Sequence, residues 1–152
     1  MSDELKKFKK SFGRQLGMTG KAMYRRLNDN LAEAGFRINA DHYIILRNLQ
    51  HQDGMNQQQI SQILARDKTA TKRLIDLLET EKLVKRVPLA CDRRHNMIHL
   101  TPKGKRLCGQ LIELGDRTNR EALAGIDLQD IKVCTNVLAH VLHNVNSDRN
   151  GR

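Results

Sequence analysis

Residues 56–80 read NQQQISQILARDKTATKRLIDLLET and predict two short amphipathic helices. Asn56, followed three residues later by Gln59, is the capping-box pattern that begins a helix. Asp67 is a preferred N-cap residue, so a second helix is expected to begin at Lys68 and run to about residue 81. Only the residues around Arg66 connect the two helices. The helices must therefore meet at a sharp corner.

A short β-hairpin is predicted directly after this helix pair. Residues 84–89 are rich in β-branched and apolar side chains, residues 92–96 form a charged turn, and residues 97–100 read Met-Ile-His-Leu. A corner of two helices followed by a hairpin is typical of a winged helix-turn-helix lobe. We place this lobe at residues 38–101, with the hairpin as its wing.

One long helix and one shorter helix are predicted before the lobe's central pair. Apolar residues recur at helical spacing over residues 4–34, where three glycines, at positions 13, 17 and 20, predict a bend or break. Gly35 is expected to end that helix. Asn39 is expected to cap the next helix, which reaches about residue 50 before a turn containing Gly54.

Two helices are predicted after the hairpin. Thr101 and Pro102 suit the N-cap and first position of a helix that reaches about residue 122. Asp127 is expected to cap the last helix, whose apolar stripe steps by three and four residues from Ile131 to Val145. The fold class is therefore mainly α with a small β-hairpin wing. We expect one domain over residues 1–147 and a disordered tail at 148–152.

The charge of the chain is concentrated in its centre. The 27 Lys and Arg against 17 Asp and Glu give a formal net charge of +10. Residues 66–106 alone hold 12 Lys and Arg against 5 Asp and Glu, a net charge of +7. A compact basic segment is expected of a surface that faces a polyanion, whereas charge that served only solubility would be spread evenly.

Composition argues against membrane and secreted classes. No run of about 18 apolar residues is present, and the N-terminus lacks the apolar stretch of a signal peptide. Cys91, Cys108 and Cys134 are an odd number at wide spacing, which forms no disulfide framework. We expect a cytoplasmic protein with reduced thiols.

The predicted helix at 68–81 has one inward and one outward face. Ala70, Thr71, Leu74, Leu77 and Leu78 lie on the side expected to be buried. At the N-terminal end of this helix, the side chains expected to meet the major groove of DNA are those of Lys68, Thr69, Lys72 and Arg73. The acids Asp76 and Glu79 would then point away from DNA. An ordinary solvated face with a Lys72–Asp76 pair is the alternative.

Two further groups of residues are expected to contact DNA. Arg93 and Arg94, at the tip of the wing, suit insertion into a narrow minor groove. A carboxylate beside them, that of Asp92, could brace Arg94 through a bidentate pair. Asn56 and Gln57, at the start of the first helix of the pair, are expected to hold a phosphate without reading sequence.

The stretch from residue 56 to residue 107 resembles the multiple-antibiotic-resistance regulator (MarR) family. The resemblance rests on Asp92-Arg93-Arg94, followed by residues 98–104, which read Ile-His-Leu-Thr-Pro-Lys-Gly, and on the helix at 68–79 before them. It implies a transcriptional regulator that binds a pseudo-palindromic operator as a homodimer. Helices 4–34 and 102–147 would form the dimer, the helix at 68–81 would enter the major groove, and Arg94, oriented by Asp92, the minor groove.

The chain departs from the family pattern at two positions. Lys82 stands where the family often has glycine before the strand, so the end of the preceding helix is expected to differ. Ala70 stands where a hydroxyl residue is common, which puts one DNA contact in doubt.

Many such regulators respond to a small phenolic ligand held between the dimer helices and the DNA-binding lobe. The resemblance therefore implies a repressor released by a small aromatic anion. Four residues from segments that could line that cleft are Arg14, Arg37, His42 and Tyr43. Simple surface or core placement is the alternative for these side chains.

The cysteines and histidines of the sequence bear on other function classes. Cys91, beside arginines, is the one candidate redox thiol, and Cys108 and Cys134 are expected in the core. His140 and His143 have the spacing of metal ligands but lack a third, so no metal and no cofactor are expected. No catalytic constellation is visible, and an enzyme is not expected. The alternatives are a winged-helix protein-interaction module and a redox- or metal-responsive regulator.

Overall fold

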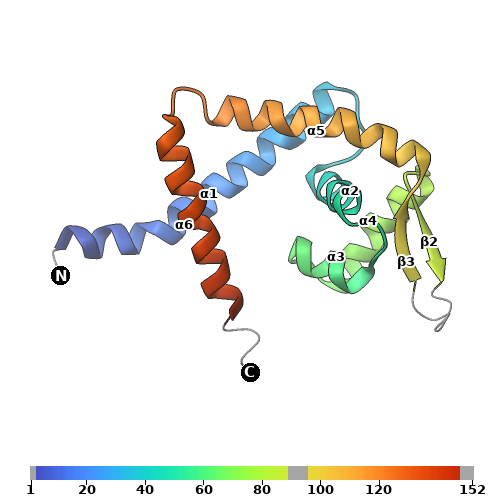
Figure 1. Ribbon diagram of the computed structural model, residues 1–152, viewed down its shortest axis with the longest axis horizontal. Coiled ribbons are helices and arrows are strands. Elements are labelled where there is room, and N and C mark those ends of the chain that lie inside the picture. The colour runs from blue at the N-terminus through green and yellow to red at the C-terminus, as the bar shows by residue number, and fades with distance from the viewer. Residues whose placement is uncertain (1–2, 89–95, 148–152) are drawn as a thin grey trace. The chain divides into compact units, whose positions relative to one another are not determined.

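The computed structural model describes residues 3–88 and 96–147, with side chains from residue 11 onward (Figure 1). The chain divides into two compact units, Met1–Thr118 and Asn119–Arg152. No described helix combines the length and apolar character that crossing a membrane requires. The elements, in chain order, are α1 (Asp3–Glu33), α2 (Ala40–His51), β1 (Met55–Asn56), α3 (Gln57–Leu64), α4 (Lys68–Thr80), β2 (Val84–Pro88), β3 (Asn96–Leu100), α5 (Pro102–Ala122) and α6 (Leu128–Ser147).

The N-terminal helix α1 is one uninterrupted α-helix, so the break predicted at its three glycines is wrong. Among the described residues, a Cβ at any of these glycines would meet nothing within 4 Å. Gly35 ends the helix region with φ of +80°, and the N–H of Phe36 donates to the carbonyl of Leu31 at 3.0 Å. This is the Schellman geometry that a left-handed glycine permits, as predicted.

The predicted N-caps are confirmed. The side chains of Asn39 and Asn56 accept from the third backbone N–H of their helices, and both form full capping boxes. Asp67 accepts from Ala70 N at 2.8 Å, and Thr101 Oγ1 accepts from Gly104 N at 3.0 Å. Local side-chain chemistry therefore fixes where α2, α3, α4 and α5 begin.

The sheet has three strands rather than the predicted two. The order is β1-β3-β2, and both pairings are antiparallel. Val84 lies opposite Leu100 in the wing hairpin, and Met55 of β1 lies opposite Ile98. Because β1 is only two residues long, no alternating pattern could reveal it. It ties the start of α3 to the base of the wing.

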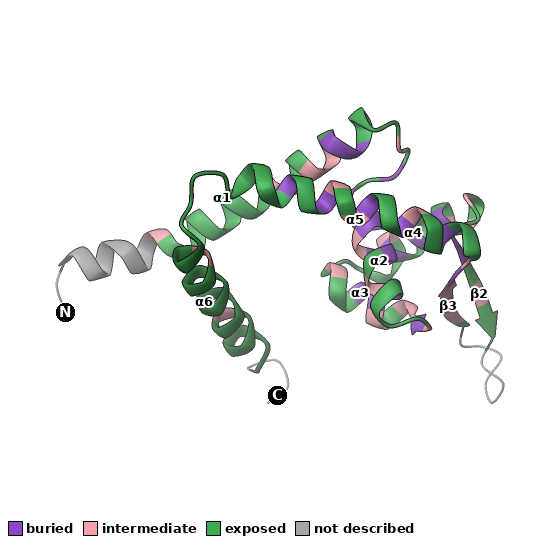
Figure 2. Ribbon diagram, turned by 45° about the horizontal axis from the view of Figure 1, so that its top comes forward, coloured by how far each residue is buried: buried purple, intermediate pink, exposed green. Residues whose placement is uncertain are grey.

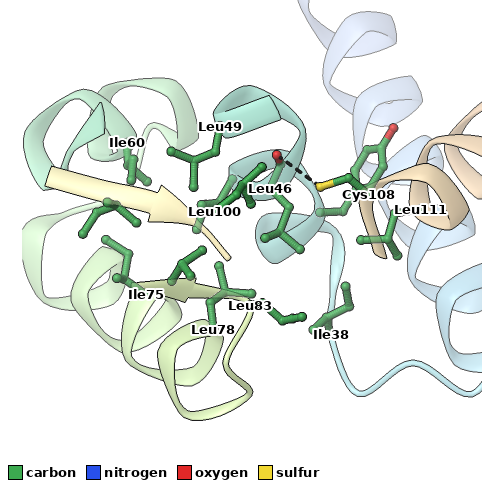
Figure 3. Close-up of a cluster of buried hydrophobic side chains, with 14 of the residues drawn as sticks. Ile38, Leu46, Leu49, Ile60, Ile75, Leu78, Leu83, Leu100, Cys108 and Leu111 are labelled. Atoms are coloured by element: carbon green, nitrogen blue, oxygen red, sulfur yellow. Dashed lines mark hydrogen bonds between the residues drawn. The ribbon is translucent and has the colours of Figure 1, made fainter. Parts of the chain in front are cut away.

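The core of the first unit is aliphatic, as expected (Figure 3). Two inward predictions were wrong: Leu77 of α4 is 38% exposed, and Ile63 of α3, which helical spacing with Ile60 also predicts to face inward, is 41% exposed. Ile75, which was not predicted in the core, is fully buried on α4, together with Thr71 and Leu78, which were. Cys108 is buried as predicted, and its thiol lies 3.6 Å from the carbonyl oxygen of Leu46. Burial raises the pKa of this thiol.

The end of α4 meets the start of α5 through backbone. Lys82, which stands where glycine is common in the resembled family, adopts φ of +58°, the left-handed conformation that favours glycine. The N–H of Leu83 then donates to the carbonyl of Leu78 at 2.8 Å. Gly104 lies directly against the carbonyl group of Leu83.

Helix α6 contains no buried residue (Figure 2). Its apolar stripe is exposed: Leu142 is 62% exposed and Val145 is 58% exposed. Cys134 is also exposed in the single chain, so its predicted place in the core is wrong. Asp127 Oδ1 accepts from Gln129 N at 2.7 Å, as expected of a residue that caps this helix.

Candidate nucleic-acid interface

The N-terminal end of α4 is exposed and cationic. Lys68, Thr69, Lys72 and Arg73 all have exposed side chains within its first two turns. The backbone N–H of Ala70 holds the pKa of Asp67 below its usual range, so the capping carboxylate stays ionised. The helix N-terminus also carries a partial positive charge. Four potential donors therefore face solvent where an anion is already favoured.

A polar pocket of about 290 Å³ adjoins this helix end. Gln57 Nε2 donates to the carbonyl of Lys68 at 3.0 Å, which joins the start of α3 to the start of α4. Two predicted phosphate contacts, Asn56 and Gln57, thus lie beside Lys68. The residues that line the pocket are Asn56, Gln57, Gln58, Lys68, Arg86, Asn96 and Ile98.

Three of these lining residues were missed in the sequence: Gln58, Arg86 and Asn96. The strands bring the last two to the pocket, because Arg86 pairs with Ile98 and Pro88 with Asn96 in the β2–β3 register. A hairpin was predicted here, but its exact register was not. Register decides which strand residues face α3 and α4.

The acids on α4 are paired with cations. Lys72 Nζ donates to Asp76 Oδ2 at 2.7 Å, which is the pair that the alternative interpretation anticipated. Arg86, from β2, forms ion pairs with both Asp76 and Glu79. Hydrogen bonds from Lys72 and then from Arg86 hold the pKa of Asp76 below its usual range. The carboxylates are therefore structural partners, which a helical projection of α4 alone could not show.

The base of the wing is anchored to the turn after α2. Asp53 Oδ1 accepts from Leu100 N at 2.9 Å, and Asp53 Oδ2 lies 3.2 Å from His99 Nδ1. Partial burial raises the pKa of Asp53, but the hydrogen bonds from Leu100 and His99 outweigh it and the net direction is down. This contact holds β3 against the helical part of the lobe.

A second contact joins α1 to the helix-turn-helix corner. Arg66 lies one residue before the cap of α4, and its Nη2 is 3.2 Å from Asp41 Oδ2. Tyr24 of α1 completes the group: burial and a hydrogen bond with Asp41 raise its pKa. The start of α4 is thus connected to α1 as well as to α2.

The four effector candidates occupy different environments. Arg14 and Arg37 are exposed. His42 is buried, and its Nδ1 accepts from Asn39 N at 3.2 Å in the capping box of α2. Tyr43 is buried with its hydroxyl against Gly115. The pocket beside α4 contains none of the four.

His42 has one unusual feature. Burial lowers the pKa of its imidazole, and because Nδ1 is an acceptor, Nε2 carries the proton. No described group accepts a hydrogen bond from this buried Nε2.

Some candidates lie outside the described residues. These include the wing residues Asp92, Arg93 and Arg94, the thiol of Cys91, and the tail at 148–152. His140 and His143 are exposed on α6. Within the described part of the chain, no group of three His, Cys, Asp or Glu side chains is arranged to hold a metal ion.

Known proteins resemble this chain in both sequence and structure. The MarR family model matches residues 38–95. The transcriptional regulator PA3341 is 30% identical over 90% of this chain and 98% of its own, with a TM-score of 0.78. A MarR transcriptional regulator from Methanosarcina mazei Go1 is 25% identical over 91% and 98%, with a TM-score of 0.82. A mutant MarR from E. coli complexed with operator DNA shares the fold: 24% identity over 93% and 99%, and a TM-score of 0.77.

Proposed function

This chain belongs to the MarR family of transcriptional regulators, and from that membership we propose that it is a cytoplasmic repressor that binds a pseudo-palindromic DNA operator. The observation that carries the proposal is the exposed group Lys68, Thr69, Lys72 and Arg73 on the capped end of α4. The operator DNA bound to the similar E. coli MarR supports it. The amides of Asn56 and Gln57 would hold a phosphate beside this group.

The experiment that tests this proposal is a salt series. An operator duplex is selected from a random pool, and its dissociation constant is measured between 50 and 200 mM salt. Because each neutralised phosphate releases counterions, affinity is expected to fall by about 10³-fold or more over this roughly fourfold range. Half-sites about 10 bp apart in the selected duplex would reflect a two-fold protein. A flat salt response would reject DNA binding in favour of a protein-interaction module.

We further propose that separate parts of the chain bind DNA and form the dimer. Residues 38–101 would bind DNA, with Arg93 and Arg94 at the wing tip suited to the minor groove. The contact of Arg94 and its orientation by Asp92 are what the family resemblance implies. Residues 4–34 and 102–147 would form the dimer. The anchoring of β3 by Asp53 supports a wing of fixed direction.

The exposed stripe of α6 supports the homodimer. A contiguous apolar face on a 20-residue helix with no buried residue is costly in water and marks a surface that another chain covers. A second copy supplies the same stripe, which suits a two-fold interface. The exposed large apolar residues on this stripe are Val137, Leu138, Leu142 and Val145.

Charges placed in this stripe are expected to separate the dimer. The double variant Leu138→Glu/Leu142→Glu should sediment as a monomer at micromolar concentration, because burying two carboxylates in an apolar interface is unfavourable. The matched control is Asn136→Glu/His140→Glu, which adds the same charges to the opposite side of α6. A control that also dissociates, or a wild type that is already monomeric, would remove the proposal.

We propose that a small aromatic anion releases the operator, with Arg14, Arg37, His42 and Tyr43 as its candidate contacts. Support comes from His42: its buried Nε2–H has no acceptor among the described residues, and a carboxylate could supply one. With benzoate as the probe, operator affinity of the wild type should fall at millimolar concentration. His42→Gln keeps an acceptor for the capping box but displaces the donor, and should lose at least half of that response. An equal response in both proteins would exclude His42.

A further inference from the structure

Arg86 joins the wing strand β2 to α4 through ion pairs. Arg86 Nη2 lies 2.6 Å from Asp76 Oδ1, and Arg86 Nη1 pairs with Glu79. The backbone N–H of Arg86 also donates to Glu79 Oε1 at 3.3 Å. The Arg86 side chain is 22% exposed and the two carboxylate side chains are each 41% exposed, so the contact is partly shielded from solvent on the arginine side. Two carboxylates on α4 thus fix the direction of β2.

Asp76 has a second partner on the proposed DNA-binding face. Its other oxygen, Oδ2, accepts from Lys72 Nζ at 2.7 Å, and the Lys72 side chain is 63% exposed. One carboxylate therefore serves Arg86 and Lys72 at the same time. The group of Lys72, Arg86, Asp76 and Glu79 carries two positive and two negative charges, so its cations are balanced before any DNA arrives.

This balance affects random and operator DNA differently. A cation that already holds a carboxylate gains little from a loosely placed phosphate, because it must give up one partner for another. An exposed ion pair is nevertheless weak, and a well-aligned contact in the operator can replace it. The carboxylate also restricts the rotamers of Lys72, so less conformational freedom is lost when the operator binds.

We propose that Asp76 is a specificity-determining residue, which withholds the charge of Lys72 from non-specific DNA and, with Glu79, positions the wing strand through Arg86. The proposal rests on the proposed function, since it presumes that α4 meets DNA. It assigns a role in DNA selection to acids that would not themselves contact the duplex.

The test compares Asp76→Asn with wild type on the selected operator and on a scrambled duplex of equal length, across the salt series. In the variant, affinity for the scrambled duplex is expected to rise about threefold to tenfold. On the scrambled duplex, the slope of log affinity against log salt should steepen by about 0.9 per protomer, the value for one additional neutralised phosphate. The ratio of operator to scrambled affinity should fall by the same factor, about threefold to tenfold.

Three further variants separate this role from general electrostatics. Asp29→Asn makes the same charge change on an exposed position of α1 and should leave the ratio unchanged. Glu79→Gln leaves the Lys72–Asp76 pair intact, so its slope on scrambled DNA should match wild type. Lys72→Gln combined with Asp76→Asn should restore the wild-type salt slope on scrambled DNA, because the cation that Asp76→Asn releases is no longer present.

Two results would overturn the inference: an Asp76→Asn variant with wild-type slope and ratio, or an Asp29→Asn variant with the same effect. A wild type whose affinity does not depend on salt would instead reject the proposed function, and the inference with it. Circular dichroism checks that every variant is folded.

Discussion

Replacing Gly104 by alanine is expected to lower the melting temperature by roughly 6–12 °C. A Cβ at this position would overlap the carbonyl oxygen of Leu83, and would lie 3.0 Å from its carbonyl carbon and 3.3 Å from Leu100 Cδ2. The Leu83 carbonyl cannot retreat cheaply, because Thr101 N donates to it at 3.0 Å. Overpacking of this kind costs about 3 kcal/mol, and each kcal/mol shifts the melting temperature of a chain of this size by about 2–4 °C.

Gly109→Ala is the matched control for this prediction. Gly109 is exposed on the same helix, and a Cβ there would meet nothing within 4 Å. Alanine is favoured over glycine inside a helix by about 1 kcal/mol, so this variant should melt slightly higher than wild type. Thermal unfolding followed by circular dichroism measures both. Equal melting temperatures for the two variants would mean that the backbone contact at Gly104 does not constrain the fold.

The triple variant Lys68→Gln, Lys72→Gln and Arg73→Gln is expected to bind the operator at least about 100-fold more weakly at physiological salt, a loss of about 2.8 kcal/mol. The three exposed cations lie within two turns of the capped end of α4. Removing three phosphate or base contacts should also reduce the salt slope by about 2.7 per protomer. Fluorescence anisotropy with the labelled operator gives both values.

The charge-matched control removes three exposed cations from α1 and α5: Lys21→Gln, Arg25→Gln and Lys105→Gln. It should retain operator affinity within a few-fold of wild type. If both triple variants lose affinity equally, net charge rather than the N-terminal end of α4 determines binding, and the major-groove assignment fails.

The helix boundaries could be predicted because their causes are local. Asn39, Asn56 and Asp67 each accept a hydrogen bond from a backbone N–H three residues later, a relation that is visible in the sequence. The burial of α4 was predicted less well, since Leu77 and Ile75 exchanged places relative to expectation. Which side of a short helix is buried depends on the elements that pack against it, in this case the sheet and α3.

The candidate interface was predictable where one helix defines it. The exposed cations of α4 follow from helical spacing, and the polar start of α3 follows from its capping box. The pairing of Arg86 with Asp76 and Glu79 was not foreseen, because it joins a helix to a strand whose register was unknown. The Tyr24–Asp41–Arg66 group was missed for the same reason: it joins three separate elements.

The sequence by itself determined that two capped helices and a hairpin follow one another between longer helices, and that Lys68, Thr69, Lys72 and Arg73 share the exposed end of α4. These features depend on interactions within one helix or one turn. Only the tertiary structure decided that β1 completes the sheet and that the acids of α4 hold the wing strand. Those contacts join residues from different elements, and their geometry is set by packing and strand register, which local residue patterns do not encode.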